Sequence, residues 1–155
     1  MAQYALTTTV PVEKTRVEIE KTLVKYGATS FLAGFHQNNA FIQFVMKSKM
    51  VRFHVQLPKV DHFKKDGRGH IRSDSQLSDA YDQATRQRWR AMLLVLKAKL
   101  EAVESGIASF EEEFLSHILL PDGSTVGQWM IPQVEAAYKT GQMPSMLPGL
   151  PAHKE

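Results

Sequence analysis

The chain has 155 residues, of which 43% are apolar and 23% charged, and its formal net charge at pH 7 is +3. This length suits one hydrophobic core, so we expect a single domain over residues 1–141 followed by a tail at 142–155. The absence of cysteine excludes disulfide bridges, thiolate catalysis and cysteine-ligated zinc. No apolar run approaches the roughly 18 residues of a membrane span, and the first residues lack the pattern of a secretory signal. We therefore expect a soluble, cytoplasmic protein without membrane contact.

Residues 12–26 have the apolar spacing of an amphipathic helix. Val12, Ile19 and Leu23 follow each other at helical intervals, which places them on one face. Gly27 is suited to the residue just past a helix end, because glycine readily adopts a left-handed backbone conformation. A helix of about four turns is expected here.

After this helix the apolar pattern changes to a twofold period. The segments rich in aromatic and β-branched residues are 31–35, 41–46 and 51–57. Asn38 and Asn39 suit the positive-φ positions of a tight turn, so consecutive strands with short connections predict an antiparallel meander. One face of this sheet should be covered by helices, while the other presents Arg52 and His54 to solvent or to a ligand.

The segment 58–76 is polar and basic, with the turn sequence D-G-R-G at 66–69. Two interpretations remain open, a flexible loop and a protruding basic hairpin. A connection of this length in a small domain is usually functional or disordered, and the recurrence of cations beside Phe63 favours a function.

A long central helix is predicted over residues 78–104. Ser78 is placed to cap its start, with acidic residues in the following turn. The apolar stripe that should face the core consists of Leu93, Leu96, Leu100 and Val103.

Two capping boxes predict two shorter C-terminal helices. S-F-E-E at 109–112 opens a helix to about residue 117, and T-V-G-Q at 125–128 opens one over residues 126–139. The buried side of the second helix should consist of Trp129, Ile131, Val134, Ala137 and Tyr138. The tail at 142–155 is rich in proline and is expected to be an extended arm or disordered. The fold class is therefore α+β: an N-terminal helix, a three-stranded antiparallel meander, a long central helix, two shorter helices and an extended tail.

Motifs for catalysis or metal binding are missing. The six histidines form no H-x-H or H-E-x-x-H pattern, and a zinc site would have to be assembled from unrelated parts of the fold. The chain contains no G-x-S-x-G, no P-loop and no G-x-G-x-x-G sequence. We expect no enzymatic activity, no metal and no cofactor.

Positive charge is concentrated in one third of the chain. Between Lys47 and Lys99 there are 13 Lys or Arg and 5 Asp or Glu residues, a balance of +8, which leaves −5 for the remainder. Such segregation favours an anionic partner, nucleic acid first, although a merely solvated surface is the alternative. The residues expected to contact phosphates are Lys49, Arg52, Lys64, Lys65, Arg68, Arg72, Arg86, Arg88 and Arg90.

These cations are expected to gather on one rim of the sheet as a continuous basic surface, because strand ends and the loop that follows them lie together in a meander backed by a helix. Binding would then be salt-sensitive and tolerant of sequence. Phe63 or Trp89 is available to stack on an exposed base. For Trp89 we favour the alternative, a position in the core.

Several segments resemble a family of small uncharacterised proteins of phages, prophages and related mobile elements. The resemblance covers residues 9–151 and is carried by R-Q-R-W-R-A-M-L-L-V-L-K-A-K-L-E-A-V-E-S-G-I (86–107), F-E-E-E-F-L (110–115), L-P-D-G-S-T-V (120–126) and M-L-P-G-L-P (146–151). It implies a bacterial cytoplasm and a role in replication, recombination or the contest with host defence, without established site residues. The β-β-β-α order also looks like the core of single-strand annealing proteins, at the level of the fold alone.

Two functions follow as hypotheses. The first is a non-enzymatic accessory protein that binds nucleic acid, DNA before RNA, through the basic loop and the arginines of the central helix. The second is a protein-interaction module, for example an inhibitor or adaptor acting on a host or phage complex such as an anti-defence protein. In both, surplus apolar surface and the tail favour a homo-oligomer.

Overall fold

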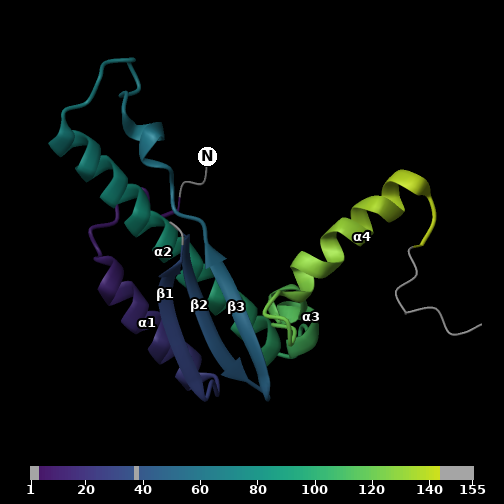
Figure 1. Ribbon diagram of the computed structural model, residues 1–155. Coiled ribbons are helices and arrows are strands. Elements are labelled where there is room, and N and C mark those ends of the chain that lie inside the picture. The colour runs from purple at the N-terminus through teal and green to yellow at the C-terminus, as the bar shows by residue number, and fades with distance from the viewer. Residues whose placement is uncertain (1–3, 37–38, 144–155) are drawn as a thin grey trace, which may run out of the picture.

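The computed structural model describes residues 4–36 and 39–143 of the chain. Its elements, with η denoting a 3-10 helix, are α1 (Val12–Lys25), β1 (Ser30–His36), β2 (Asn39–Met46), β3 (Lys49–Val55), η1 (Val60–Phe63), α2 (Asp74–Glu104), α3 (Phe110–Phe114), η2 (Leu115–His117) and α4 (Val126–Thr140). The α+β fold class and the expected order of elements are confirmed (Figure 1).

The strands form an antiparallel sheet in the order β1-β2-β3. Asn39 was expected in the first turn, but it is the first residue of β2 and pairs with His36, so that expectation is wrong. The connection between these strands is residues 37–38, which lie outside the described residues. β3 is an edge strand of the sheet. An isolated bridge between Val51 and Ile118 covers part of its free edge.

Lys47 and Ser48 form the two-residue turn between β2 and β3, since Met46 pairs with Lys49. Both turn residues have a left-handed backbone, with φ of 49° at Lys47 and 61° at Ser48. A turn with two positive φ angles matches the twist of a hairpin, but side chains other than glycine, asparagine or aspartate adopt it with strain.

One face of the sheet, which we call the covered face, carries the core. Ile42, Phe44 and Phe53 point from β2 and β3 into a cluster with Ile19 of α1 and Trp89 of α2. In Figure 1, α2 crosses diagonally behind the three strands of the sheet. Further buried residues of the helices are Leu23, Leu93, Leu96 and Leu100, which confirms the apolar faces expected for both helices.

α2 begins four residues earlier than the sequence suggested. Ser73, and not Ser78, is its N-cap: Ser73 Oγ accepts from Gln76 N at 3.4 Å, and Gln76 Oε1 accepts from Ser73 N at 3.0 Å. Both serines are followed by acidic residues, and only the earlier one has a glutamine three positions on to complete a capping box.

The C-terminal helices begin at the two expected capping boxes, Ser109 with Glu112 and Thr125 with Gln128. The expected burial along α4 is wrong. Gly127 is the only residue of α4 that is buried among those described, and the close approach of Ser116 requires glycine there, since a Cβ would lie 2.7 Å from the carbonyl oxygen of Ser116.

Beyond this contact α4 extends away from the rest of the domain (Figure 1). Its large apolar side chains are exposed, with Trp129 48%, Ile131 57%, Val134 45% and Tyr138 89% accessible. The apolar pattern predicted a helix with one apolar face, but not the surface against which that face packs.

Candidate nucleic-acid interface

Residues 64–72 form an ordered hairpin, which we call the basic hairpin. Lys65 and Ile71 pair as an antiparallel bridge, and Arg72 N donates to the carbonyl oxygen of Lys64 at 2.9 Å. Gly69, with φ of 87°, turns the chain at its tip. Of the two interpretations of the segment 58–76, the structure agrees with the hairpin.

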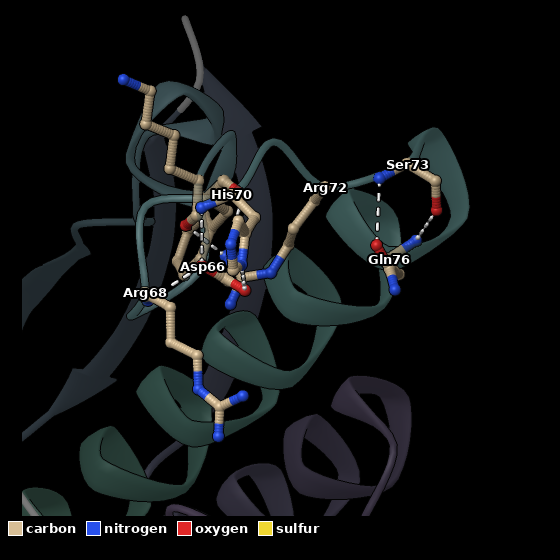
Figure 2. A network of polar contacts seen from close by, with 8 residues as sticks. Asp66, Arg68, His70, Arg72, Ser73 and Gln76 are labelled. Atoms are coloured by element: carbon tan, nitrogen blue, oxygen red, sulfur yellow. Dashed lines mark hydrogen bonds and ion pairs between the residues drawn. The ribbon is translucent and has the colours of Figure 1, made fainter.

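Asp66 directs its carboxylate into the basic hairpin. Its Oδ1 accepts from the backbone N–H groups of Arg68 at 2.8 Å and His70 at 2.9 Å, and its Oδ2 lies 3.3 Å from His70 Nδ1. The backbone N–H of His70 is the largest cause that lowers the pKa of Asp66. Figure 2 shows the carboxylate held inside the turn, whereas the side chain of Arg68 points away from it.

Arg72 braces the base of the basic hairpin. Its Nη1 donates to the carbonyl oxygens of Phe63 at 2.9 Å and Lys65 at 2.8 Å. Ser73 follows directly and caps α2, so the basic hairpin is joined to the helix without a flexible linker (Figure 2). Arg72 therefore contributes to the shape of the hairpin in addition to its charge.

Lys65 and Arg68 are the outward cations of the basic hairpin. Both side chains are exposed, and neither has a hydrogen-bond or ion-pair partner in the part of the chain that the structure describes. Lys64 Nζ lies 2.6 Å from Asp61 Oδ1, and this hydrogen bond lowers the pKa of Asp61. Exposed ion pairs of this kind are weak, so Lys64 can exchange its partner for a phosphate at little cost.

The three arginines of α2 do not form one collar. Alternate positions of an α-helix point about 200° apart, so Arg86 and Arg90 share a side that Arg88 does not. Arg90 Nη1 pairs with Glu18 Oε2 of α1 at 2.7 Å, and this contact is the largest cause that lowers the pKa of Glu18. Arg86 Nη2 donates to Gln83 Oε1 at 2.7 Å, whereas Arg88 is exposed.

Lys49 lies far from the basic hairpin. It begins β3, whereas the segment leading to the hairpin follows the end of β3 at Val55. Lys49 Nζ pairs with Glu111 Oε1 at 2.8 Å. The expected phosphate contacts thus fall into separate places, and one continuous basic surface through all of them is not present among the described residues.

The two aromatic candidates differ from each other. Trp89 is completely buried, with the guanidinium carbon of Arg16 5.9 Å from its ring, which confirms the core position. Phe63 is half-buried and packs edge-on against Tyr81, with 6.2 Å between the ring centroids. Neither ring is fully exposed to solvent, so neither offers an open face for stacking on a base.

Opposite the covered face lies the open face of the sheet, where Arg52 and His54 project as expected. The residues of this face are Leu32, Phe41, Gln43, Val45, Met50, Arg52 and His54. Gln43 Oε1 accepts from Arg52 Nε at 3.0 Å and from Nη2 at 2.7 Å, which orients the guanidinium. A cavity of about 310 Å³ is lined by Asn39, Phe41, Arg52 and His54.

Phe41 was missed as a candidate site residue, whereas Lys59 belongs to the basic segment already expected to bind phosphates. Lys59 contributes to a neighbouring cavity of about 560 Å³ that shares Asn39 with the first. The signal for Phe41 was its place between Ala40 and Ile42, because alternation along a strand sends it to the face opposite the buried pair.

Among residues 4–36 and 39–143, no three His, Asp or Glu side chains gather as a metal site would require. Glu113 and His117, one helical turn apart, are used separately: Glu113 pairs with Lys99 at 3.1 Å, and His117 stacks on Phe53. None of the described helices has both the length and the apolar character to cross a membrane.

Comparisons with known proteins give no match: no family model, no curated protein and no solved structure is similar to this chain.

Proposed function

We propose that this protein is a non-enzymatic accessory protein that binds the phosphate backbone of nucleic acid, DNA in preference to RNA. The observation that carries the proposal is the basic hairpin. Lys65 and Arg68 project from it without partners among the described residues, while the carboxylate of Asp66 is used by backbone N–H groups. An ordered turn that directs cations outward and its acidic group inward suits a polyanion.

Cations on the open face and just after β3 are further candidates for phosphate contacts. Arg52 is held in one orientation by Gln43, and Lys59 lines the cavity between the sheet and η1. Contacts with phosphates depend on charge and not on base sequence. Binding releases counterions from the nucleic acid, so affinity should fall steeply as the salt concentration rises. The setting in a phage or mobile element, in the bacterial cytoplasm, rests on the resemblance of the quoted segments and is part of this proposal.

A titration by fluorescence anisotropy tests it. Labelled single-stranded DNA, double-stranded DNA and single-stranded RNA are titrated at about 50 and about 200 mM salt. We expect binding at low salt that weakens with salt, and an affinity at least about fivefold lower when Lys65 and Arg68 are both alanine.

A matched control removes the same charge elsewhere. Lys14 and Lys21 are exposed on α1, so Lys14→Ala with Lys21→Ala lowers the net charge equally. Nucleic acid that is not retained at low salt contradicts the proposal, and an equal loss of affinity in both double variants contradicts the role of the basic hairpin.

A second candidate is a protein-interaction module, and α4 favours it. Ile131, Val134 and Tyr138 recur at the spacing of a helix-helix seam and are all exposed on a helix that extends from the domain. An apolar face of this kind suits a second copy of the same helix, in agreement with a homo-oligomer.

Light scattering tests the second candidate. We expect the wild-type chain to have at least twice the monomer mass, and Val134→Glu with Tyr138→Glu to give the monomer, because charges would be buried in the seam. Ala136→Glu, exposed and about 160° around α4 from Tyr138, is the control. A wild-type monomer contradicts self-association through α4.

A further inference from the structure

The ring of Phe41 lies across the neighbouring strand of the sheet. Phe41 pairs with Gly34 of β1, and a Cβ at Gly34 would stand only 2.9 Å from the ring atoms Cε1 and Cζ. Any other residue at position 34 would require this ring to shift. Glycine therefore makes room for Phe41 to rest on the backbone of β1, so that the ring is presented on the open face.

An arginine and a histidine of the neighbouring strand lie next to the ring. The guanidinium carbon of Arg52 lies over the Phe41 ring, 5.7 Å from its centre, and His54 is the residue of β3 that pairs with Phe41. Gln43 fixes Arg52 through two of its nitrogens. The ring thus has a positively charged, oriented neighbour on the side of the β2–β3 turn, whereas the end of β3 that leads to η1 lies beyond His54.

A cavity borders the half-buried ring, and a second cavity lies beside it. Asn39 lines both the cavity of about 310 Å³ at Phe41, Arg52 and His54 and the cavity of about 560 Å³ that contains Lys59 and Asp61. A planar apolar surface with cations beside it complements a chain that alternates flat bases with phosphates. A double helix does not offer this, because its bases are stacked on each other.

We propose that the open face binds single-stranded nucleic acid by stacking one unpaired base on Phe41, with Arg52 and His54 beside the adjoining phosphates. This inference rests on the proposed function and adds to it the strandedness of the partner and the position of the base. Because every base has a stacking face, the site tolerates any sequence. Stacking on one aromatic ring should raise affinity roughly tenfold over a backbone without bases.

The test compares two oligonucleotides of equal length and charge, oligo-deoxythymidine and an abasic deoxyribose-phosphate chain. The wild-type protein should bind the first roughly tenfold more tightly. Phe41→Leu, which keeps an apolar strand-forming residue, should bind the two equally while its affinity for the abasic chain stays unchanged. Phe41→Tyr keeps the ring and should retain the preference, and Phe35→Leu, an exposed aromatic of β1 facing the other way, should retain it as well.

The outcomes separate the two proposals. If the wild-type protein binds both oligonucleotides equally, the base-stacking site is overturned and phosphate binding stands. If Phe41→Leu retains the preference, the site is also overturned. If the wild-type protein binds neither oligonucleotide, the proposed function is overturned together with this inference.

Discussion

The two faces of the sheet are formed by the same strands, but one face is buried and the other is partly exposed. On the covered face, Phe44 and Phe53 meet Phe114 and the helices, and the side chains are almost fully buried. On the open face, Phe41, Arg52 and His54 alternate with those residues and line a cavity. Because neighbouring residues of a strand point to opposite faces, adjacent positions such as Arg52 and Phe53 should respond very differently to substitution.

The difference separates stability from binding. The covered face removes apolar surface from water, which is the main favourable term in folding. The open face leaves an aromatic ring and an oriented guanidinium half exposed, which adds little to stability. Substitutions on the covered face should therefore lower stability, and substitutions on the open face should lower affinity.

Trp89→Ala should produce the largest loss of stability. Trp89 is completely buried between α2, α1 and the sheet, so its removal leaves a large cavity and lowers the free energy of unfolding by about 3–5 kcal/mol. Urea unfolding followed by circular dichroism measures it. A loss below about 1 kcal/mol would mean that Trp89 is not the core anchor.

Arg52→Ala should mainly affect binding. Its guanidinium donates to the half-buried side chain of Gln43 and to the exposed carbonyl oxygen of Gly123, so the free energy of unfolding should fall by only about 1 kcal/mol, while affinity for single-stranded DNA falls about tenfold. Arg88→Ala removes the same charge from α2, which packs on the covered face, and should leave affinity nearly unchanged. Equal losses in both variants would contradict the assignment of binding to the open face.

His117, which stacks on Phe53 of the covered face, should make the free energy of unfolding depend on pH. It stacks on Phe53 with 3.8 Å between ring centroids, and burial, the largest cause, together with the charge of Lys99 lowers the pKa of His117. The unfolded chain therefore takes up the proton more readily, and stability should fall as pH decreases below about 6.5.

His117→Phe keeps the stacked ring without the titrating group. Urea unfolding at about pH 7.5 and about pH 5.5 should show a smaller decrease in this variant than in the wild type. The carboxylates with lowered pKa, such as Glu18 and Asp66, lose their contribution only at more acidic pH. An identical decrease in the two proteins would remove His117 as the cause.

Ser48→Gly should give the smallest change, and in the opposite direction. The substitution relieves a positive φ of 61° in the turn that joins β2 to β3 and touches neither face. The free energy of unfolding should rise by about 0.5–1 kcal/mol, with unchanged DNA affinity. Thermal unfolding measures the gain, and a loss of stability would show that the turn is not strained at Ser48.

Local rules predicted much of the fold. The strict alternation in β3 placed Arg52 and His54 opposite Val51 and Phe53, and a capping box marked the start of α4. These features depend on a few neighbouring residues, so the sequence contains them in full. Local propensity gave the wrong result at Asn39. Asparagine favours turns, but here it is the first residue of β2.

Long-range placement was much less accessible. The sequence does not show that Glu18 of α1 reaches Arg90, or that Lys49 lies at the end of β3 away from the basic hairpin. For α4 the apolar pattern was correct and the expected burial was wrong, because periodicity does not specify a packing partner. The position of the Phe41 ring over β1 could not be predicted, because it depends on the strand register that pairs Phe41 with Gly34.

If the proposed function is correct, cations of the basic hairpin and of the open face contact phosphates of the same nucleic acid. The most direct measurement is the salt dependence of single-stranded DNA affinity for the wild type and for Arg52→Ala combined with Arg68→Ala. Each lost phosphate contact should reduce the slope of log affinity against log salt by about 0.7, so the double variant should be less steep by about 1.4. An unchanged slope in the double variant would contradict the claim.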